Sequence, residues 1–368
     1  MSFNVQGSVS SLATGRYAAV KQQILDYSPD LLGLQEDQPD TWGAASNFSL
    51  EGYTRYCYDG TITGVDPERL AIYVKNGLTV KTSGYTGLIS SDSMRALTYD
   101  DVKSGGKYAL NDAMFDQLLA LGSGSTDKEK INDALHNGQV WYLSDGAAKS
   151  MNLLGGRRMT YVVVEKAGQD VMYVNMHVQH RSQNNKYEGS EAAIQGTVEG
   201  KGSYYNLVQT VRSYERMKSF ELAQAKIEAL LQTYPNAEVV ITGDFNDTKA
   251  GAIRDFCGGG ADADGVYDVA IDAGYHDAAL NAKTNGGNLT TTWNSYFTNS
   301  KEGQAKEVTN KTPLGSTAGT DGRIDFCFVS DGVSVNCYQT GAPYGKAGEN
   351  GRQYYLSDHL SLIVDIVF

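Results

Sequence analysis

The sequence predicts an α/β fold built as one domain over residues 1–368. Two observations support this prediction. Short apolar segments with strand character alternate along the chain with segments of helical periodicity, which is typical of mixed α/β folds. No evident linker divides the chain, and a core of ordinary size can form because 41% of the residues are hydrophobic and 20% are charged.

The strands are predicted from apolar runs that are bounded by turn residues. Asn76-Gly77, Ala167-Gly168 and Asp331-Gly332 each separate two such runs, so we expect three hairpins at these turns. The expected strands are Phe3 to Val5, Asp30 to Glu36, Leu70 to Val74 with Leu78 to Val80, Met159 to Glu165 with Asp170 to Met176, Glu238 to Thr242, Arg323 to Val329 with Val333 to Tyr338, and Leu360 to Phe368.

Two helices have a clear apolar stripe. Residues Arg16 to Tyr27 place Tyr17, Val20, Ile24 and Tyr27 on one face, and Pro29 ends the run. A longer helix is expected near Tyr214 to Tyr234, before Pro235. Its stripe consists of Met217, Phe220, Ile227, Leu231 and Tyr234.

Two regions interrupt this rhythm and are predicted to be insertions, at about 83–139 and 182–213. The first is rich in Ser, Gly and Asp, and it contains two helix candidates, Asp112 to Leu121 and Lys128 to His136. The second is polar and Gly-rich and lacks periodicity. We expect both insertions to frame a substrate site.

Charge and cysteine content narrow the function classes. The net charge of −12 gives the chain no overall attraction to polyanions, so a nuclease would need local positive charge or bound metal. The four cysteines form no CxxC pair, which argues against a structural zinc site. Apolar runs are too short for stable membrane insertion. The 24 tyrosines and 41 glycines suggest a secreted or extracytoplasmic protein, although no leader is visible; we expect that an upstream segment is missing.

Five predicted strands begin or end in polar residues of similar type. A single carboxylate at a strand end usually caps a turn, but five such ends suggest a common site. Oxygen ligands from separate strands suit Mg²⁺ or Mn²⁺, with Ca²⁺ as an alternative. These ends are Gln35-Glu36, Asn175-Met176-His177, Gly243-Asp244-Phe245-Asn246-Asp247, Arg323-Ile324-Asp325 and Ser357-Asp358-His359.

In order and spacing, these motifs resemble the endonuclease/exonuclease/phosphatase superfamily, which includes deoxyribonuclease I. The resemblance extends from Ser2-Phe3-Asn4-Val5 to Ser357-Asp358-His359-Leu360, with Trp141-Tyr142-Leu143-Ser144 between them. It implies a layered sandwich of two mixed β-sheets flanked by helices, with the site at one end. It also implies a hydrolase acting on phosphoesters with the help of a divalent metal.

The resemblance implies a metal site formed by Asn4, Glu36 and Asp358. Glu36 would bind the principal metal with Asn4 beside it, and Asp358 would supply a second carboxylate to the same ion or to another. Asp37 and Asp247 stand next to motif residues. The sequence leaves open whether these two support the site or only form turns.

The resemblance also implies the catalytic roles. Asp325 would hold His359 in the tautomer that orients or deprotonates the attacking water. Asp244 would position that water or the phosphate, and Asn246 would donate a hydrogen bond to a phosphate oxygen. His177 would stabilise developing charge or protonate the leaving oxygen; an imidazole titrates near pH ~6.5 and suits either role.

Three further residues are expected to contact substrate. Arg157 is favoured over Arg158 as the family's phosphate-binding arginine, although two arginines at a strand edge are more often only solvated. His180 and Arg181 are expected at the rim of the site. The spacing His177-x-x-His180 could also indicate zinc, but no third ligand lies nearby in the sequence.

Three functions remain open from the sequence. A nuclease, endo- or exo-, acting on nucleic acid is the first. The second is a phosphoesterase for a lipid headgroup or an inositol phosphate. The 5-phosphatase branch would carry Trp-Cys-Asp-Arg where this chain has Gly322-Arg323-Ile324-Asp325. Bacterial sphingomyelinases share the pattern His177-Val178-Gln179 but usually lack an Arg-Ile-Asp motif. The third, an inactive binding module, is disfavoured because every motif residue is present. The oligomeric state stays open.

Overall fold

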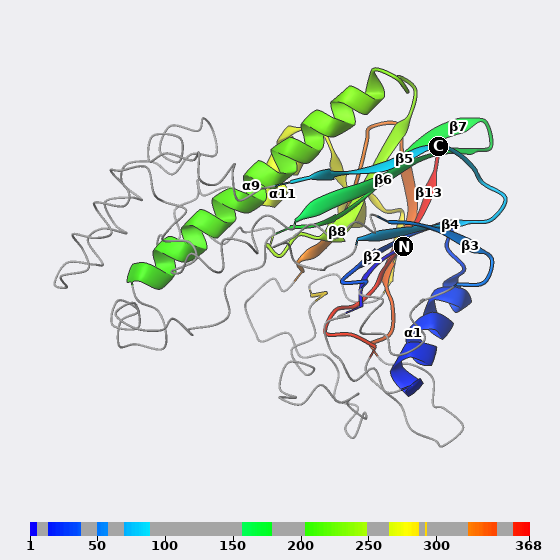
Figure 1. Cartoon of the computed structure of the whole chain (residues 1–368), viewed down its shortest axis with the longest axis horizontal. Coiled ribbons are helices and arrows are strands. Elements are labelled where there is room, and N and C mark those ends of the chain that lie inside the picture. The colour runs from blue at the N-terminus through cyan, green and yellow to red at the C-terminus, as the bar shows by residue number, and fades with distance from the viewer. Residues whose placement is uncertain are drawn as a thin grey trace.

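The computed structural model describes residues 1–5, 14–37, 50–57, 70–88, 157–178, 203–248, 265–286, 291–292, 323–343 and 356–368. Two β-sheets form the centre of this part of the chain, and helices lie outside them (Figure 1). The predicted fold, a layered α/β sandwich of two mixed sheets, is therefore confirmed. None of the helices in the described ranges is long and apolar enough to cross a lipid bilayer.

Each sheet contains both parallel and antiparallel neighbours. Sheet A has the order β10 (Thr284–Gly286), β12 (Ser334–Thr340), β13 (Leu362–Val367), β1 (Ser2–Asn4), β2 (Leu31–Gln35), β4 (Ala71–Lys75) and β3 (Tyr53–Tyr56). Sheet B has the order β5 (Thr79–Gly87), β6 (Arg158–Lys166), β7 (Gln169–His177), β8 (Glu238–Asp244), β11 (Asp325–Val329) and β9 (His276–Asp277).

A helix packs against the outer face of each sheet. α1 (Thr14–Tyr27) buries Val20 and Ile24 in a cluster with residues of β1 and β2, and it ends just before Pro29. On the other side, Phe220 of α9 (Ser203–Leu231) makes an edge contact with Phe328 of β11 at 6.3 Å. α11 (Val266–Asp272) lies beside α9 (Figure 1), and α12 (Ala278–Asn281) contacts β11 and β12.

The main core fills the space between the sheets. Apolar side chains of both sheets form one buried cluster, and alternate residues of the strands supply it. Its members include Ile72, Val74, Val335 and Leu362 from sheet A, and Val162, Val164, Val171, Val240 and Cys327 from sheet B. Cys57, Cys327 and Cys337 are free thiols.

Asn175 of β7 fastens the two sheets together. Its amide nitrogen donates to the backbone oxygens of Leu34 at 2.9 Å and Ala71 at 3.0 Å, and its oxygen accepts from Gln35 at 2.6 Å. Gly33 permits this approach, because a Cβ atom there would lie 2.8 Å from the Asn175 side chain. The bridge fixes the distance between strands that end in polar motifs.

One of the three predicted hairpins forms. β6 and β7 pair antiparallel around Ala167-Gly168, whose φ values of 52° and 84° match a type I′ turn. The other two predictions are wrong. The chain turns at Asn76-Gly77 and Asp331-Gly332, but the strands before and after each turn belong to different sheets. A tight turn reverses the chain but does not determine which strands pair. Here β4 pairs with β2, β5 pairs with β6, and β12 pairs with β13.

The insertion boundaries also need correction. Residues 83–87 belong to β5, so the first interruption starts later than predicted; its two helix candidates lie outside the described residues. The second predicted insertion ends inside α9, which begins at Ser203 and not near Tyr214. No Gly or Pro occurs from 203 to 231, so the helix can extend upstream once packing of its later part has nucleated it.

Candidate active site

The strand ends that carry the polar motifs meet at one end of the sandwich. Asn4 ends β1, and Glu36 follows directly after the parallel strand β2. His177 ends β7 and is the register partner of Asp244, which ends β8. Asp325 begins the antiparallel strand β11 and is also a partner of Asp244. The fold therefore brings together motifs that lie far apart in the sequence.

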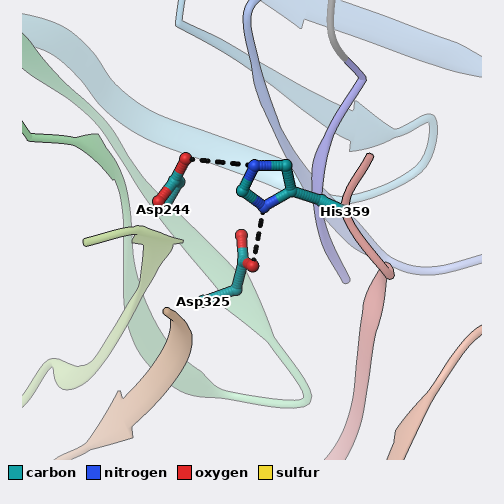
Figure 2. A group of neighbouring side chains, drawn as sticks. All are labelled: Asp244, Asp325 and His359. Carbon is teal, nitrogen blue, oxygen red and sulfur yellow. Dashed lines mark hydrogen bonds and ion pairs between the residues drawn. The ribbon is translucent and has the colours of Figure 1, made fainter. Parts of the chain in front are cut away.

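Asp325 and His359 form the hydrogen-bonded pair expected from the resemblance (Figure 2). His359 Nδ1 lies 2.8 Å from Asp325 Oδ2, and both side chains are buried. Burial acts to lower the pKa of His359, but the carboxylates of Asp325 and Asp244 outweigh it and hold the pKa well above its ordinary value. Burial raises the pKa of Asp325, against the opposing effect of His359. The carboxylates around the ring therefore make the imidazole of His359 a stronger base than a free imidazole.

Asp244 is the point where the site converges. Its Oδ2 atom accepts a hydrogen bond from Asn4 Nδ2 at 2.9 Å and lies 3.3 Å from His177 Nε2. The same carboxylate oxygen lies 3.6 Å from His359 Nε2 (Figure 2). Its Oδ1 atom accepts from the backbone nitrogen of Asn246 at 2.8 Å. Both carboxylate oxygens are thus held in place, as positioning of a water or a phosphate would require.

Glu36 lies beside this centre in a strained backbone conformation. Asn4 Nδ2 donates to Glu36 Oε1 at 3.2 Å as well as to Asp244, so one amide group bridges the two carboxylates. Glu36 has a φ of 56°, a left-handed conformation that a glutamate rarely adopts and that costs about 1–3 kcal/mol. Such strain persists where the surrounding structure imposes it, and it is concentrated at functional sites.

Asn246 shares this left-handed conformation, with a φ of 49°. Its side-chain nitrogen lies 2.9 Å from His177 Nε2 and donates to the backbone oxygen of Val178 at 3.2 Å. The same Nε2 atom also lies 3.3 Å from Asp244 Oδ2, so whether it accepts from Asn246 or donates to Asp244 depends on the tautomer of the ring. His177 and Asn246 therefore act as one unit next to Asp244.

Asp358 joins the group through its neighbour Ser357. Ser357 Oγ donates to the backbone oxygen of Asn4 at 2.6 Å and lies 3.2 Å from Asp358 Oδ1. The half-buried Asp358 carboxylate also contributes to the raised pKa of His359, so it lies near the imidazole. All eight residues predicted as catalytic or metal-binding thus lie in one region: Asn4, Glu36, His177, Asp244, Asn246, Asp325, Asp358 and His359.

The donor set fits a hard divalent cation. The carboxylates of Asp244 and Asp325 lie close together, and Asp244 itself raises the pKa of Asp325, so a bound cation would relieve their repulsion. Asp244, Asp325 and His359 each offer a ligand atom, and these atoms lie within 4.8 Å of one another. The Nδ1 atom of His359 already forms the hydrogen bond with Asp325, which leaves Nε2 as the other ring nitrogen in this group.

Arginine–aspartate pairs lie next to three of the motifs. Arg216 and Arg323 are buried and Arg55 is half-buried, and sequence reasoning missed Arg55 and Arg216. Each pair includes a residue within two positions of a site residue. The ion-pair distances are 3.1 Å for Arg55–Asp37, 3.2 Å for Arg216–Asp247 and 2.5 Å for Arg323–Asp277. Asp37 and Asp247, which the sequence left open, therefore support the motif segments. Arg323 also stacks on Phe326, with its guanidinium carbon 4.6 Å from the ring centre.

Of the three residues predicted to contact substrate, the structure describes Arg157. Arg157 is buried, and it precedes Arg158, the register partner of His177, so it lies at the same end of sheet B as the site. His180 and Arg181 lie outside the described residues, as does the segment around Trp141. Their contact with substrate stays a prediction.

Comparisons with known proteins agree with this fold. Three solved structures share the fold over the whole chain. The first is an endonuclease/exonuclease/phosphatase family protein from Bacteroides thetaiotaomicron, with 19% identity, 96% of that chain covered and a TM-score of 0.54. The second is the mannosyl-6-phosphatase Bt3783 of B. thetaiotaomicron VPI-5482, with 18% identity, 98% coverage and a TM-score of 0.53. The third is truncated Caenorhabditis elegans TDP2, with 14% identity, 96% coverage and a TM-score of 0.53, and each match covers 100% of this chain. A search of curated proteins found no significant match. The model of the Endonuclease/Exonuclease/phosphatase family matches residues 1–359, and the chain belongs to this family.

Proposed function

We propose that this protein is a divalent-metal-dependent phosphoester hydrolase that activates water with the Asp325–His359 pair. One observation supports this proposal above all. A buried Asp–His pair with a 2.8 Å hydrogen bond lies next to the ordered carboxylate of Asp244, and Asn4 connects that carboxylate to Glu36. An Asp–His pair, an ordered acceptor and a cation site are the parts that metal-assisted hydrolysis of phosphoesters needs.

The proposed metal ligands are Asn4, Glu36 and Asp358, with Mg²⁺ or Mn²⁺ as the ion and Ca²⁺ as the alternative. A bound divalent ion would supply neutralisation of the phosphate charge. The strained φ of Glu36 supports a functional role, because the left-handed backbone conformation of this residue lowers the stability of the fold. Asn4 donates its amide nitrogen to both Glu36 and Asp244, so it connects the proposed metal site to the Asp244 carboxylate.

His359 is proposed as the base. Its Nδ1 is fixed by Asp325, so its Nε2 is the atom that can take a proton from water. The 3.6 Å between His359 Nε2 and Asp244 Oδ2 exceeds a normal hydrogen bond, and a water held by Asp244 would complete the contact. His177, ordered by Asn246, is proposed to protonate the leaving oxygen or to stabilise its charge.

The proposed substrate is a phosphodiester of nucleic acid, with Arg157, His180 and Arg181 as its contacts. A small phosphoester, such as a sugar phosphate or a lipid headgroup, is the second candidate. Two observations favour it: the net charge of −12, and the shared fold with a protein whose name is mannosyl-6-phosphatase. The arginines of the three arginine–aspartate pairs already neutralise aspartates. Neutralisation of the phosphate charge at this site would therefore depend mainly on the metal.

A substrate panel tests the proposal. Purified protein with Mg²⁺ or Mn²⁺ would be assayed on plasmid DNA, single-stranded RNA, sphingomyelin, inositol phosphates, mannose 6-phosphate and a bis-aryl phosphodiester. Cleavage of DNA or RNA above the small substrates supports the nuclease, and the reverse order supports the second candidate. Undiminished hydrolysis by His359→Ala would refute the assignment of His359 as the base. Absence of hydrolysis on the whole panel overturns the proposal.

A further inference from the structure

Thr292 is a buried residue that touches the Asp325 side of the site without belonging to any motif. Its Oγ1 atom accepts hydrogen bonds from the backbone nitrogens of Ile324 and Asp325, each at 3.0 Å, and its side chain is completely buried. It therefore holds the first residues of β11, where the strand presents Asp325 to the site.

The backbone of Thr292 holds the other half of the pair. Its carbonyl oxygen accepts from the backbone nitrogen of Leu360 at 2.7 Å, and Leu360 directly follows His359. Asp325 lies on sheet B, whereas the segment with His359 leads into β13 of sheet A. One residue thus connects the two chain segments, from different sheets, that must approach to form the 2.8 Å hydrogen bond.

The hydroxyl oxygen of Thr292 accepts as many hydrogen bonds as its lone pairs allow. A threonine hydroxyl has one donor hydrogen and two acceptor lone pairs. The two backbone nitrogens occupy the lone pairs, and the hydroxyl also acts to lower the pKa of Asp325, which burial raises. Valine has nearly the same shape but offers none of these bonds, and it would leave two buried N–H groups without this acceptor.

We infer that Thr292 is a positioning residue that holds Asp325 and His359 in the geometry of proton transfer. This inference rests on the proposed function for its catalytic consequence, but the geometry it describes can be measured separately. Thr292 touches neither substrate nor metal in this account; it acts through the strand start and the carboxylate of Asp325.

The experiment compares Thr292→Val, Thr292→Ser and Thr292→Cys with the wild type. Thr292→Val should lower kcat roughly 10- to 100-fold with little change in KM, because misplacement by about 1 Å costs catalysis on that order. Thr292→Ser retains the hydroxyl and should restore most of kcat. Thr292→Cys keeps a weaker acceptor of similar size and should fall between them. Thr291→Val, the same change one residue earlier, is the matched control.

A spectroscopic readout separates positioning from stability. The His359 Nδ1 proton should give a low-field proton resonance by NMR, identified by its loss in Asp325→Asn. The inference predicts that this resonance weakens or shifts in Thr292→Val and Thr292→Cys and persists in Thr292→Ser and Thr291→Val. Should Thr292→Val not fold, Thr292→Cys provides the same comparison.

The inference is overturned if the folded Thr292→Val or Thr292→Cys protein is less stable but keeps the wild-type kcat and resonance. In that case Thr292 only supports the fold. If the wild type hydrolyses no phosphoester, the proposed function fails, and the resonance alone decides whether Thr292 positions the pair.

Discussion

The coupling between Asp325 and His359 gives a quantitative test of the proposed mechanism. In Asp325→Asn the carboxylate that accepts from Nδ1 is lost, whereas the Asp244 carboxylate still lies 3.6 Å from Nε2. The neutral imidazole would then favour a proton on Nε2, which is the nitrogen that must accept one from water. His359→Ala removes the base altogether.

Each single change should lower kcat/KM roughly 10²- to 10⁴-fold, the usual cost of losing a positioned acid or base. This corresponds to about 3–5 kcal/mol of barrier, at about 1.4 kcal/mol for each tenfold change. The two residues share one function, so the double variant should be scarcely slower than His359→Ala alone.

The assay is steady-state hydrolysis of the best substrate from the panel at saturating Mg²⁺. Asp331→Asn is a matched control, because Asp331 forms an exposed pair with His276 outside the site, and its rate should equal the wild type. If the losses of the two single changes add in the double variant, the residues act independently and the reasoning fails. His359 would then be a structural residue, and Asp244 would become the candidate base.

Three further predictions concern the segments that support the site. Gly243→Ala should destabilise the protein by about 2–5 kcal/mol in urea unfolding, because Gly243 has a φ of +156° and a Cβ atom there would lie 2.0 Å from the Met176 backbone oxygen. A variant as stable as the wild type would refute this packing. Glu36→Asn should abolish activity while raising stability by roughly 1 kcal/mol, because asparagine tolerates the left-handed conformation; a loss of stability would contradict the assigned strain. Arg216→Met should lower the free energy of unfolding by about 3–5 kcal/mol, because it leaves a buried carboxylate without its arginine, and adding Asp247→Leu should recover most of this loss. Equal stability of the single and the double variant would disprove the role of the pair.

Local pattern predicted the elements of this fold well, and it predicted their pairing poorly. The Ala167-Gly168 turn and the apolar runs around it identified β6 and β7, since turn and pairing are local there. The turn at Asn76-Gly77 is equally clear in the sequence, yet its strands join different sheets. Pairing in a sandwich depends on contacts between distant segments, and a single sequence does not display these.

The candidate site divides in the same way. Asp325 and His359 were predictable because each belongs to a motif that resembles a family pattern, and the structure joins them. Thr292 was not predictable: it stands in a run of threonines, and its partner Asp325 lies 33 positions away. Arg216 gave no signal either, because one arginine in a helical pattern normally faces solvent, and only the packing of α9 shows that it is fully buried.

The central claim is that a divalent metal and the Asp–His pair together hydrolyse a phosphoester, and metal titration tests it most directly. Protein stripped with EDTA would be assayed while Mg²⁺ is added back, alongside Glu36→Gln. We predict no hydrolysis without metal, saturable recovery in the wild type, and recovery in Glu36→Gln only at a much higher Mg²⁺ concentration. Full activity of the wild type in chelator would contradict the account.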